Sequence, residues 1–236
     1  ILSLLLLGGS TTTASEPIRF DSTTNRVTIL ELFTSQGCSS CPPAELWLSK
    51  FKTDPRLWRE IVPIAFHVDY WDRLGWKDPF ATRANTARQY QYARVWKGQS
   101  VYTPGFSLNG REWKGWYQGR KEPFSAPQST GRLVAELQGR KLTASYSGPE
   151  NNLELHIAML GFGTVTRVGA GENRNRKLIE DFVCLASTNH VANNSRWTVP
   201  LPTCTPQNTT RKAIALWVSR RGHPEPLQAT GGWLID

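Results

Sequence analysis

One stretch near the N-terminus constrains the fold more than any other part of the chain. Residues 27–33, Val-Thr-Ile-Leu-Glu-Leu-Phe, are apolar and β-branched and predict a buried strand. A short polar turn then leads to a Cys-x-x-Cys motif formed by Cys38 and Cys41, and residues 42–53 have helical character. Two prolines follow Cys41 and suit a first helical turn, where a missing N–H costs nothing. The sequence therefore predicts a strand, a turn, two cysteines and a helix in succession.

This arrangement favours redox chemistry at the two cysteines. A helix N-terminus favours negative charge, so we expect the pKa of Cys38 to be lowered and its thiolate to be reactive. Cys41, about one turn further on, is placed to attack a mixed disulfide on Cys38. The chemistry requires Cys38 to lie at a helix start and to be open to solvent. A structural disulfide and half of a zinc site remain as alternatives.

The N-terminal segment predicts export. Residues 1–16 contain an apolar run followed by small polar residues and resemble a signal peptide. No later stretch is apolar enough to cross a bilayer, so we expect no stable membrane insertion. Disulfides persist in the periplasmic or secreted location that export implies. The four cysteines then divide into the reactive pair Cys38–Cys41 and a structural disulfide between Cys184 and Cys204.

Composition and charge indicate a globular chain without a nucleic-acid partner. The chain has 236 residues, of which 39% are hydrophobic, so it is long enough for a proper core. Its 28 basic and 19 acidic residues give a net charge of +9, but the basic residues are spread along the chain. We find no nucleic-acid motif and expect no cofactor. His67, Asp69, Asp72 and Asp78 suggest hydrogen bonds that hold a loop rather than a metal site, so we expect no metal ion.

The first half continues with alternating strand and helix patterns. Residues 61–69 predict a second buried strand, residues 81–96 a helix, and Asn109-Gly110 a β-hairpin joining 106–108 to 112–117. Residues 126–138 predict a further helix with Leu133, Val134 and Leu137 as its apolar stripe.

Two segments are expected to border the cysteines. The aromatic residues Tyr70, Trp71 and Trp76 follow the second strand, at the sheet edge where ligands bind in open α/β sheets. Thr103 and Pro104 precede the hairpin, and a cis bond between them would bring this backbone beside Cys38. We therefore expect Thr103 and the three aromatic residues to contact a substrate.

The second half is predicted to be all β. Leu153, Leu155 and Ile157 alternate with more polar residues and indicate a strand with one buried face. Turn signals separate the expected strands, which suggests an antiparallel sandwich or a sheet appended to the first half. The strands are expected at residues 141–146, 153–160, 177–186, 196–201, 212–220 and 228–234. The expected division is residues 17–139 for the first domain and 140–236 for a β-rich second domain.

The order of motifs in the first half resembles the thioredoxin fold. Within that fold, several ordered blocks resemble a family of uncharacterised exported bacterial proteins without a firmly assigned activity. The blocks are residues 31–44 with the sequence Glu-Leu-Phe-Thr-Ser-Gln-Gly-Cys-Ser-Ser-Cys-Pro-Pro-Ala, His-Val-Asp-Tyr-Trp-Asp at 67–72, Gly-Trp-Lys-Asp-Pro-Phe at 75–80, Val-Tyr-Thr-Pro at 101–104 and Gly-Glu-Asn at 171–173.

The resemblance implies an α/β fold class, with a thioredoxin-like domain followed by an antiparallel β-rich region. It also implies that Cys38 is the nucleophilic cysteine, Cys41 the resolving cysteine and Pro104 the cis-proline. Glu31 is a counterpart, one residue out of step, of the buried acidic residue of thioredoxins and would relay the proton of Cys41. A glycine, Gly37, stands where thioredoxins have a tryptophan before the first cysteine.

The leading functional hypothesis is an exported thiol–disulfide oxidoreductase whose partner is a protein or small-molecule thiol or disulfide. The first alternative is a non-enzymatic binding protein with a permanent Cys38–Cys41 bridge. The second is a chaperone that holds a soft ion such as Cu(I) on the two thiolates.

Overall fold

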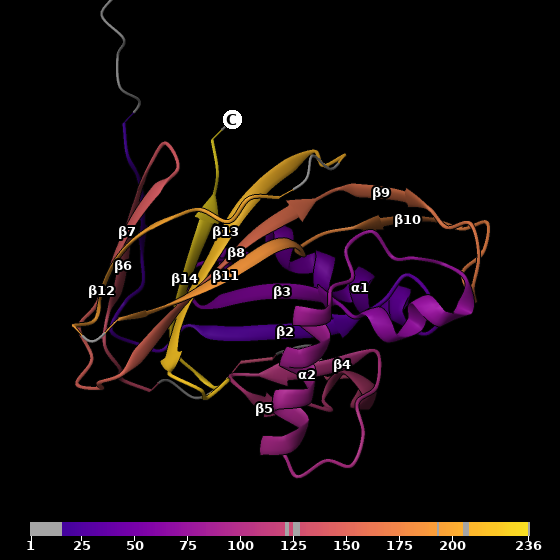
Figure 1. Cartoon of the computed structure of the whole chain (residues 1–236), viewed down its shortest axis with the longest axis horizontal. Helices are drawn as coiled ribbons and strands as arrows, with labels where there is room; N and C mark the ends of the chain where they lie inside the picture. Colours follow the sequence, from indigo (N-terminus) through magenta and orange to yellow (C-terminus); the bar gives the residue numbers. More distant parts are fainter. Residues whose placement is uncertain (1–15, 121–122, 125–127, 193, 205–207, 236) are drawn as a thin grey trace, which may run out of the picture.

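The chain folds into a β-rich structure. The computed structural model describes residues 16–120, 123–124, 128–192, 194–204 and 208–235. The expected signal-peptide segment lies outside these residues except for Glu16. Within the described residues the chain forms fourteen strands, two α-helices and three short 3₁₀ helices (Figure 1). The 3₁₀ helices are η1 (Lys50–Thr53), η2 (Asp69–Leu74) and η3 (Trp116–Gln118).

A mixed eight-stranded sheet runs through the molecule, in the order β14-β13-β8-β11-β3-β2-β4-β5. Its strands come from both halves of the sequence, and the two groups meet where Val183 of β11 pairs with Ala65 of β3. The strands are β2 (Thr28–Thr34), β3 (Ile61–His67), β4 (Gly105–Leu108), β5 (Arg111–Glu112), β8 (Leu153–Phe162), β11 (Val183–Ala192), β13 (Arg211–Arg220) and β14 (Pro226–Trp233).

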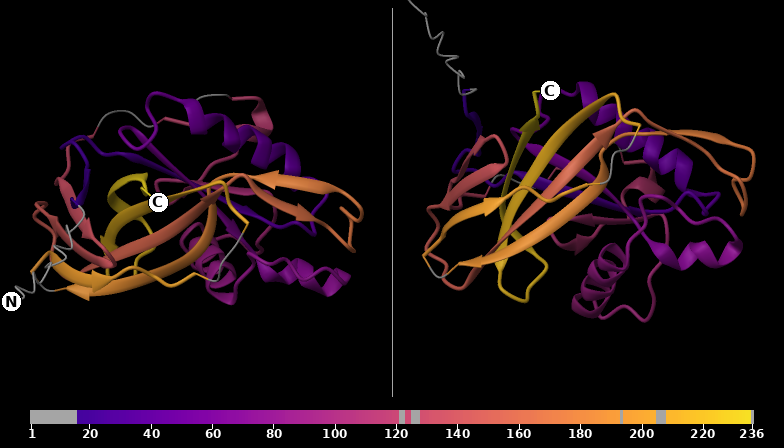
Figure 2. Two further views of the ribbon diagram at one scale, coloured as in Figure 1. Left: turned by 90° about the horizontal axis from the view of Figure 1, so that it is seen from above. Right: turned by 45° about the horizontal axis from the view of Figure 1, so that its top comes forward.

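The two α-helices cover opposite faces of the central strands. Strands β2 and β3 are parallel, and the chain between them forms α1 (Cys41–Ser49), whereas α2 (Arg83–Val95) follows β3. Side chains alternate between the faces of a strand. Thr34 of β2 accordingly contacts α1 through Glu45, whereas its neighbour Phe33 packs against Tyr92 of α2. Figure 2 shows α1 and α2 on the two sides of these strands.

A four-stranded antiparallel sheet packs on the β8–β13 end of the large sheet. It contains β1 (Ile18–Asp21), β6 (Leu133–Gln138), β7 (Lys141–Tyr146) and β12 (Arg196–Pro200) in the order β1-β6-β7-β12. Alternate residues of β8 and β13 serve two cores, so that Leu155 faces the small sheet and Leu160 faces the core shared with β2 and β3. This end of the molecule is therefore a two-layer β-sandwich.

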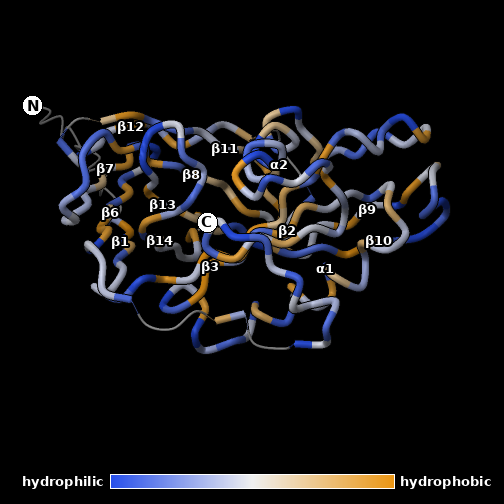
Figure 3. The backbone as a smooth tube through the Cα atoms, turned by 90° about the horizontal axis from the view of Figure 1, so that it is seen from below, coloured by the Kyte–Doolittle hydropathy of each residue, from blue (hydrophilic) through white to orange (hydrophobic). Residues whose placement is uncertain are grey.

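A hairpin of β9 (Thr164–Arg167) and β10 (Lys177–Glu180) projects from the large sheet beside α1 (Figure 1). Its tip reaches back to the segment after β3, where Gly171 packs against Trp76 and Gly37. Hydrophobic residues gather along the central strands, whereas the outer loops are mainly hydrophilic (Figure 3). No helix among the described residues has the length and apolar character needed to cross a membrane.

This organisation overturns the expected fold class. A thioredoxin-like α/β domain followed by a separate β-rich region is wrong, because strands from both sides of residue 140 share one hydrogen-bonded sheet. The core cluster around β2 and β3 likewise includes Leu160, Ala215 and Trp217 from the second half. The expected β-rich character of the second half is confirmed, but it extends into the first half through β1, β4, β5 and β6.

The helix expected at residues 126–138 is also wrong. Residues 133–138 form β6, in which Leu133, Ala135 and Leu137 point into the sandwich core and the residues between them do not. An apolar pattern that fits a helical stripe can equally fit a strand period when the segment is short. The strand expected at 177–186 is two strands, β10 and β11, separated at Asp181 and Phe182, and Phe182 has a positive φ of 61°.

Candidate functional site

Cys38 and Cys41 form a disulfide at the start of α1. Cys41 is the first residue of the helix, and its backbone N–H donates to the carbonyl of Cys38 at 3.2 Å. The Cys38 sulfur lies 3.2 Å from Ser40 Oγ and 3.8 Å from the Thr103 carbonyl oxygen. The Thr103–Pro104 bond is cis, as the sequence predicted. The structure thus brings the two sulfurs, the helix start and Thr103–Pro104 together.

The disulfide is closed to solvent. Both cysteines have a relative exposure of 0%, whereas Ser39 and Ser40 between them are exposed. The expectation that Cys38 would be open to solvent is therefore wrong for the oxidised chain. The sulfurs nevertheless lie directly beneath a surface turn, with the hydroxyl of Ser40 and a backbone carbonyl as neighbours.

Two of the three predicted aromatic residues, Trp71 and Trp76, contact the turn that carries Cys38. Trp71, on η2, donates its indole N–H to Thr103 Oγ1 at 2.7 Å, and a Cβ added at Gly37 would lie only 3.0 Å from the Trp71 Cβ. Trp76 donates to Gln36 Oε1 at 3.1 Å. Tyr70 donates instead to Gln89 of α2 at 3.2 Å. Trp71 and Trp76 hold the turn in place, and Tyr70 ties η2 to α2.

The tip of the β9–β10 hairpin completes the cover. Asn173 is fully buried, and its amide donates to the carbonyls of Gln36 at 3.0 Å and Cys38 at 2.8 Å. The neighbouring Glu172 accepts the backbone N–H of Ser39 at 2.9 Å, and this hydrogen bond lowers the pKa of the Glu172 carboxyl. Sequence reasoning noted these residues only as part of a family resemblance and missed their contact with the cysteine turn.

Four buried titratable side chains lie together on the α1 side of the sheet. His67 Nδ1 lies 2.7 Å from Asp78 Oδ2, and His67 Nε2 lies 3.8 Å from Glu180 Oε1. Glu45 joins them from α1, one helical turn after Cys41, and accepts from Thr34 Oγ1 at 2.5 Å. The sequence marked His67 and Asp78 as structural residues and did not connect them with Glu45 or Glu180.

Burial and mutual charge strongly perturb this cluster. Burial opposes the charged form of His67, but the carboxylates of Asp78, Glu180 and Glu45 outweigh it and raise the His67 pKa to about 9. Burial and the neighbouring charge of Glu45 raise the pKa of Glu180 to about 8. Burial also raises the pKa of Glu45. These groups hold protons in the interior, close to the disulfide-bearing helix.

Glu31, the expected proton relay for Cys41, lies on the other face of the sheet. Its carboxylate accepts from Arg88 Nε at 2.6 Å and from the hydroxyl of Tyr92, both on α2. The side chain is fully buried in this ion pair. Because α1 and Cys41 lie on the opposite side of β2, Glu31 is not placed to exchange a proton with Cys41. The carboxylate on the α1 side is that of Glu45.

The expected disulfide between Cys184 and Cys204 is not formed, and both cysteines are free. Cys184 lies buried in β11 within the large sheet's core, whereas Cys204 follows β12 of the small sheet. The two thiols therefore belong to different layers. Burial raises the pKa of Cys184 to about 12, which makes this thiol a poor nucleophile.

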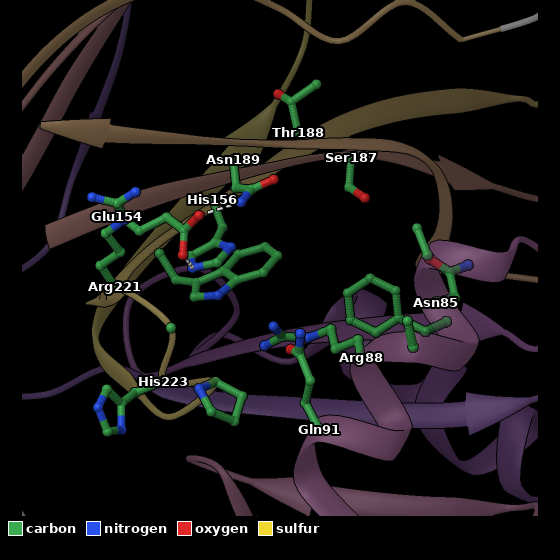
Figure 4. Close-up of a pocket in the computed structure, with 16 residues that line it drawn as sticks. Asn85, Arg88, Gln91, Glu154, His156, Ser187, Thr188, Asn189, Arg221 and His223 are labelled. Carbon is green, nitrogen blue, oxygen red and sulfur yellow. Dashed lines mark hydrogen bonds and ion pairs between the residues drawn. The ribbon is translucent and has the colours of Figure 1, made fainter.

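A separate cavity of about 510 Å³ lies on the α2 side of the sheet (Figure 4). Arg88 and Gln91 of α2 face Glu154 and His156 of β8 across it, and Asn189 of β11 donates to Glu154. The His156 ring stacks on Trp217 with centroids 4.9 Å apart. Sequence reasoning missed this cavity, because its lining comes from segments that are distant in the chain.

Two solved structures are similar to this chain over about nine-tenths of its length. A crystal structure of a protein from Agrobacterium tumefaciens is 25% identical and covers 89% of this chain and 95% of its own, with a TM-score of 0.61. HBP35 of Porphyromonas gingivalis is 12% identical, with coverage of 90% of this chain and 76% of its own and a TM-score of 0.55. Both likenesses extend over the two halves of the sheet.

The search of the curated proteins gives no match. A family model described as "Protein of unknown function (DUF1223)" matches residues 29–219, which include the disulfide, the buried cluster and the hairpin. The match spans most of the chain, so this protein belongs to the DUF1223 family of proteins of unknown function.

Proposed function

We propose that the chain is a thiol–disulfide oxidoreductase that works through Cys38 and Cys41 in an oxidising compartment outside the cytoplasm. The observation that supports this proposal most strongly is the Cys38–Cys41 disulfide at the start of α1. The unpaired N–H groups and the macrodipole of a helix N-terminus stabilise a thiolate there, so the bond can be opened and closed at neutral pH. The partner is a thiol or disulfide of a protein or small molecule.

The exchange balances without a further reagent. A substrate thiolate attacks the Cys38 sulfur, the Cys38–Cys41 bond breaks, and Cys41 leaves as a thiolate. A second substrate thiolate then attacks the substrate sulfur of the mixed disulfide and releases the Cys38 thiolate. Two electrons pass to the cysteine pair, and the substrate dithiol becomes a disulfide. The reverse sequence reduces a substrate disulfide, and the reduction potential of the pair sets the direction.

Exchange requires the cover over Cys38 to open. The contacts at the hairpin tip are a few hydrogen bonds, from Asn173 to two backbone carbonyls and from Ser39 N–H to Glu172. Each such bond has a net worth of about 0.5–1.5 kcal/mol, so their loss is an accessible fluctuation. Ser39 and Ser40 are already exposed, so a small displacement of the tip would uncover the sulfur.

A structural disulfide in a non-enzymatic binding protein is the second candidate. The observation that favours it is the complete burial of both cysteines. In that case the ligand would occupy another surface, and the cavity of Figure 4 is the natural place to look for it. Against it, a bridge between cysteines three residues apart closes a very short loop, which limits the chain entropy that it removes from the unfolded state.

Turnover and redox titration separate the two candidates. We expect Cys38→Ser to abolish turnover in an insulin-reduction or dithiol-oxidation assay, whereas Cys204→Ser, a matched change at a free and partly exposed thiol, keeps it. The pair should titrate between roughly −270 and −120 mV, the range of active dithiols. Unchanged turnover in Cys38→Ser contradicts the proposal. A potential below about −300 mV favours the structural bridge.

A further inference from the structure

The buried cluster on the α1 side contains three side chains whose free atoms converge. Glu45 comes from α1, His67 from the end of β3 and Glu180 from the end of β10. One potential ligand atom from each lies within 4.8 Å of the other two, and His67 Nε2 is 3.8 Å from Glu180 Oε1. Bonds of about 2.0–2.2 Å place the ligands of a tetrahedral ion about 3.4 Å apart. The His67–Glu180 pair would therefore have to close by about 0.4 Å, and a pair at the 4.8 Å limit by about 1.4 Å, to surround one ion.

Two of these atoms have no other partner. His67 Nε2 and Glu180 Oε1 are buried and make no hydrogen bond within the described part of the chain. His67 is fully buried, and Glu180 is 1% exposed. Buried polar atoms almost always have a hydrogen-bond partner, so two that lack one and face each other need a physical explanation. An ion between them would satisfy both atoms.

The opposite atom of each side chain is already held. Asp78 Oδ2 lies 2.7 Å from His67 Nδ1 and also accepts the backbone N–H of Gln36, so it fixes the ring with Nε2 toward the cluster. Gln36 Nε2 donates to Glu180 Oε2 at 2.6 Å, and Thr34 donates to Glu45 Oε1. A carboxylate behind a histidine and donors behind ligating carboxylates are the outer partners that metal ligands have in proteins.

We infer that Glu45, His67 and Glu180 form a buried site for one divalent first-row transition metal ion, with zinc as the first choice. One imidazole and two carboxylates match the donor atoms that zinc takes, with an exchangeable fourth position as in three-ligand sites. In the metal-bound state the imidazole would be neutral and both carboxylates ionised, so the divalent ion would displace the protons that these groups hold in the free protein and pair with the buried charges. Calcium and magnesium prefer six or more oxygen ligands and fit this set poorly.

The sequence pattern predicted no metal site and assigned His67, Asp69, Asp72 and Asp78 to a hydrogen-bonded loop, and the site inferred here uses a different set of side chains. Of His67, Asp69, Asp72 and Asp78, only His67 is a proposed ligand, and Asp78 acts behind it. Asp69 Oδ1 accepts the hydroxyl of Thr86 at 2.6 Å, so it belongs to the link between η2 and α2. Because none of the three ligands is a cysteine, the inference does not depend on redox chemistry at the disulfide.

The first test uses the full chain with its disulfide intact. After treatment with a chelator, it is titrated with zinc chloride by calorimetry, and the bound metal is counted by elemental analysis. We expect one equivalent to bind and the melting temperature to rise with zinc concentration. X-ray absorption at the zinc edge should show nitrogen and oxygen neighbours. The inference is overturned if the protein does not bind zinc at about 100 μM, a concentration at which even a weak site would be occupied. It is also overturned if sulfur is among the atoms bound to the zinc.

Isosteric variants assign the ligands. Glu45→Gln and Glu180→Gln keep the acceptors for Thr34 and Gln36, and each should weaken zinc binding by at least about 100-fold. The matched control is Glu154→Gln, which removes a carboxylate beside another histidine, His156, and should leave zinc binding unchanged. Unchanged zinc binding in the folded Glu45→Gln and Glu180→Gln proteins overturns the assignment. If one variant fails to fold, the other still tests its own ligand, and the wild-type absorption spectrum still tests for nitrogen and oxygen neighbours without sulfur.

Discussion

At the scale of single residues, His156 shows how the surroundings fix a protonation state. The ring is stacked on Trp217, and its Nε2 lies 2.8 Å from Ser219 Oγ. Burial, followed by the charge of Arg88, lowers the pKa of His156 well below its ordinary 6.5. The folded chain therefore keeps this ring neutral at pH values where the unfolded chain protonates it.

This difference predicts a specific loss of stability in mild acid. Below pH 6.5 the unfolded chain binds a proton at His156 that the folded chain does not, so the free energy of unfolding falls as the pH falls. Between pH 6.5 and 5.5 the loss from this residue is about 1 kcal/mol. In urea titrations at pH 6.5 and 5.5, the free energy of unfolding should fall by about 1 kcal/mol more for the wild type than for His156→Gln. Parallel pH profiles for the two proteins would contradict the assignment.

Single residues also show where sequence reasoning reaches its limit. Cys38, Cys41 and the cis bond before Pro104 were predictable, because the local motif determines the helix start and the prolines mark the turns. Glu31 was given the wrong neighbours, because adjacent strand residues point to opposite faces and a shift of one position exchanges α1 for α2. The sequence carries no local signal that Glu45 of α1 would meet Glu180 of β10, because the two segments are far apart in the chain.

At the scale of elements, the tip of the β9–β10 hairpin contacts the cysteine turn through hydrogen bonds. Its side chain Asn173 joins the hairpin to the carbonyls of Gln36 and Cys38 and also accepts from Arg176 at 2.7 Å. The hairpin tip is therefore held by a hydrogen bond within the hairpin and contacts the cysteine turn through a few polar groups. A change at this contact should alter access to the disulfide more than it alters global stability.

We predict that Asn173→Ala speeds reduction of the disulfide by dithiothreitol roughly 30-fold. Two hydrogen bonds worth together about 2 kcal/mol are lost, so the open state becomes more populated. The measurement is the rate of thiol appearance, with urea titrations run alongside. Arg174→Ala, a change at the exposed neighbour, is the matched control and should keep the wild-type rate. Equal rates in all three proteins would show that the tip does not limit access.

Most individual elements followed from local patterns, but their assembly did not. The patterns predicted β2, β3, α1, α2 and the β4–β5 hairpin, in which Asn109 and Gly110 have positive φ as expected for that turn. The second hairpin strand, expected at 112–117, is wrong in length, because β5 ends at Glu112 and η3 begins at Trp116. The patterns fail at β6, where a period of two also fits a helical stripe, and at β1 and β9, which are only four residues long. Short strands gain their stability from partners that a single sequence does not identify.

At the scale of the whole molecule, the shared sheet predicts one cooperative unfolding transition. The core cluster includes Leu32 and Phe66 from the first half together with Phe162 and Trp217 from the second. Loss of either half would expose this core, so neither should be stable alone. The two-domain expectation, with a boundary at residues 139–140, would instead allow separate transitions.

Urea titration should therefore give coincident curves by tryptophan fluorescence and far-ultraviolet circular dichroism. A fragment of residues 17–139 should show no cooperative transition, because it lacks β8, β11 and β13. The full-length chain in the same buffer is the control. Two resolved transitions, or a folded fragment, would contradict a single cooperative unit.

The junction between the two halves of the sheet has a mechanical consequence. Strands β11 and β3 share one register pair, Val183 with Ala65, and the cavity of Figure 4 opens beside that junction with Phe66 and Ser187 on its walls. Under a pulling force, β11 and β3 should separate before the longer strand pairs do, because only one register pair joins them. A molecule bound in the cavity would contact both sides of this junction and should raise the force needed to separate β11 from β3.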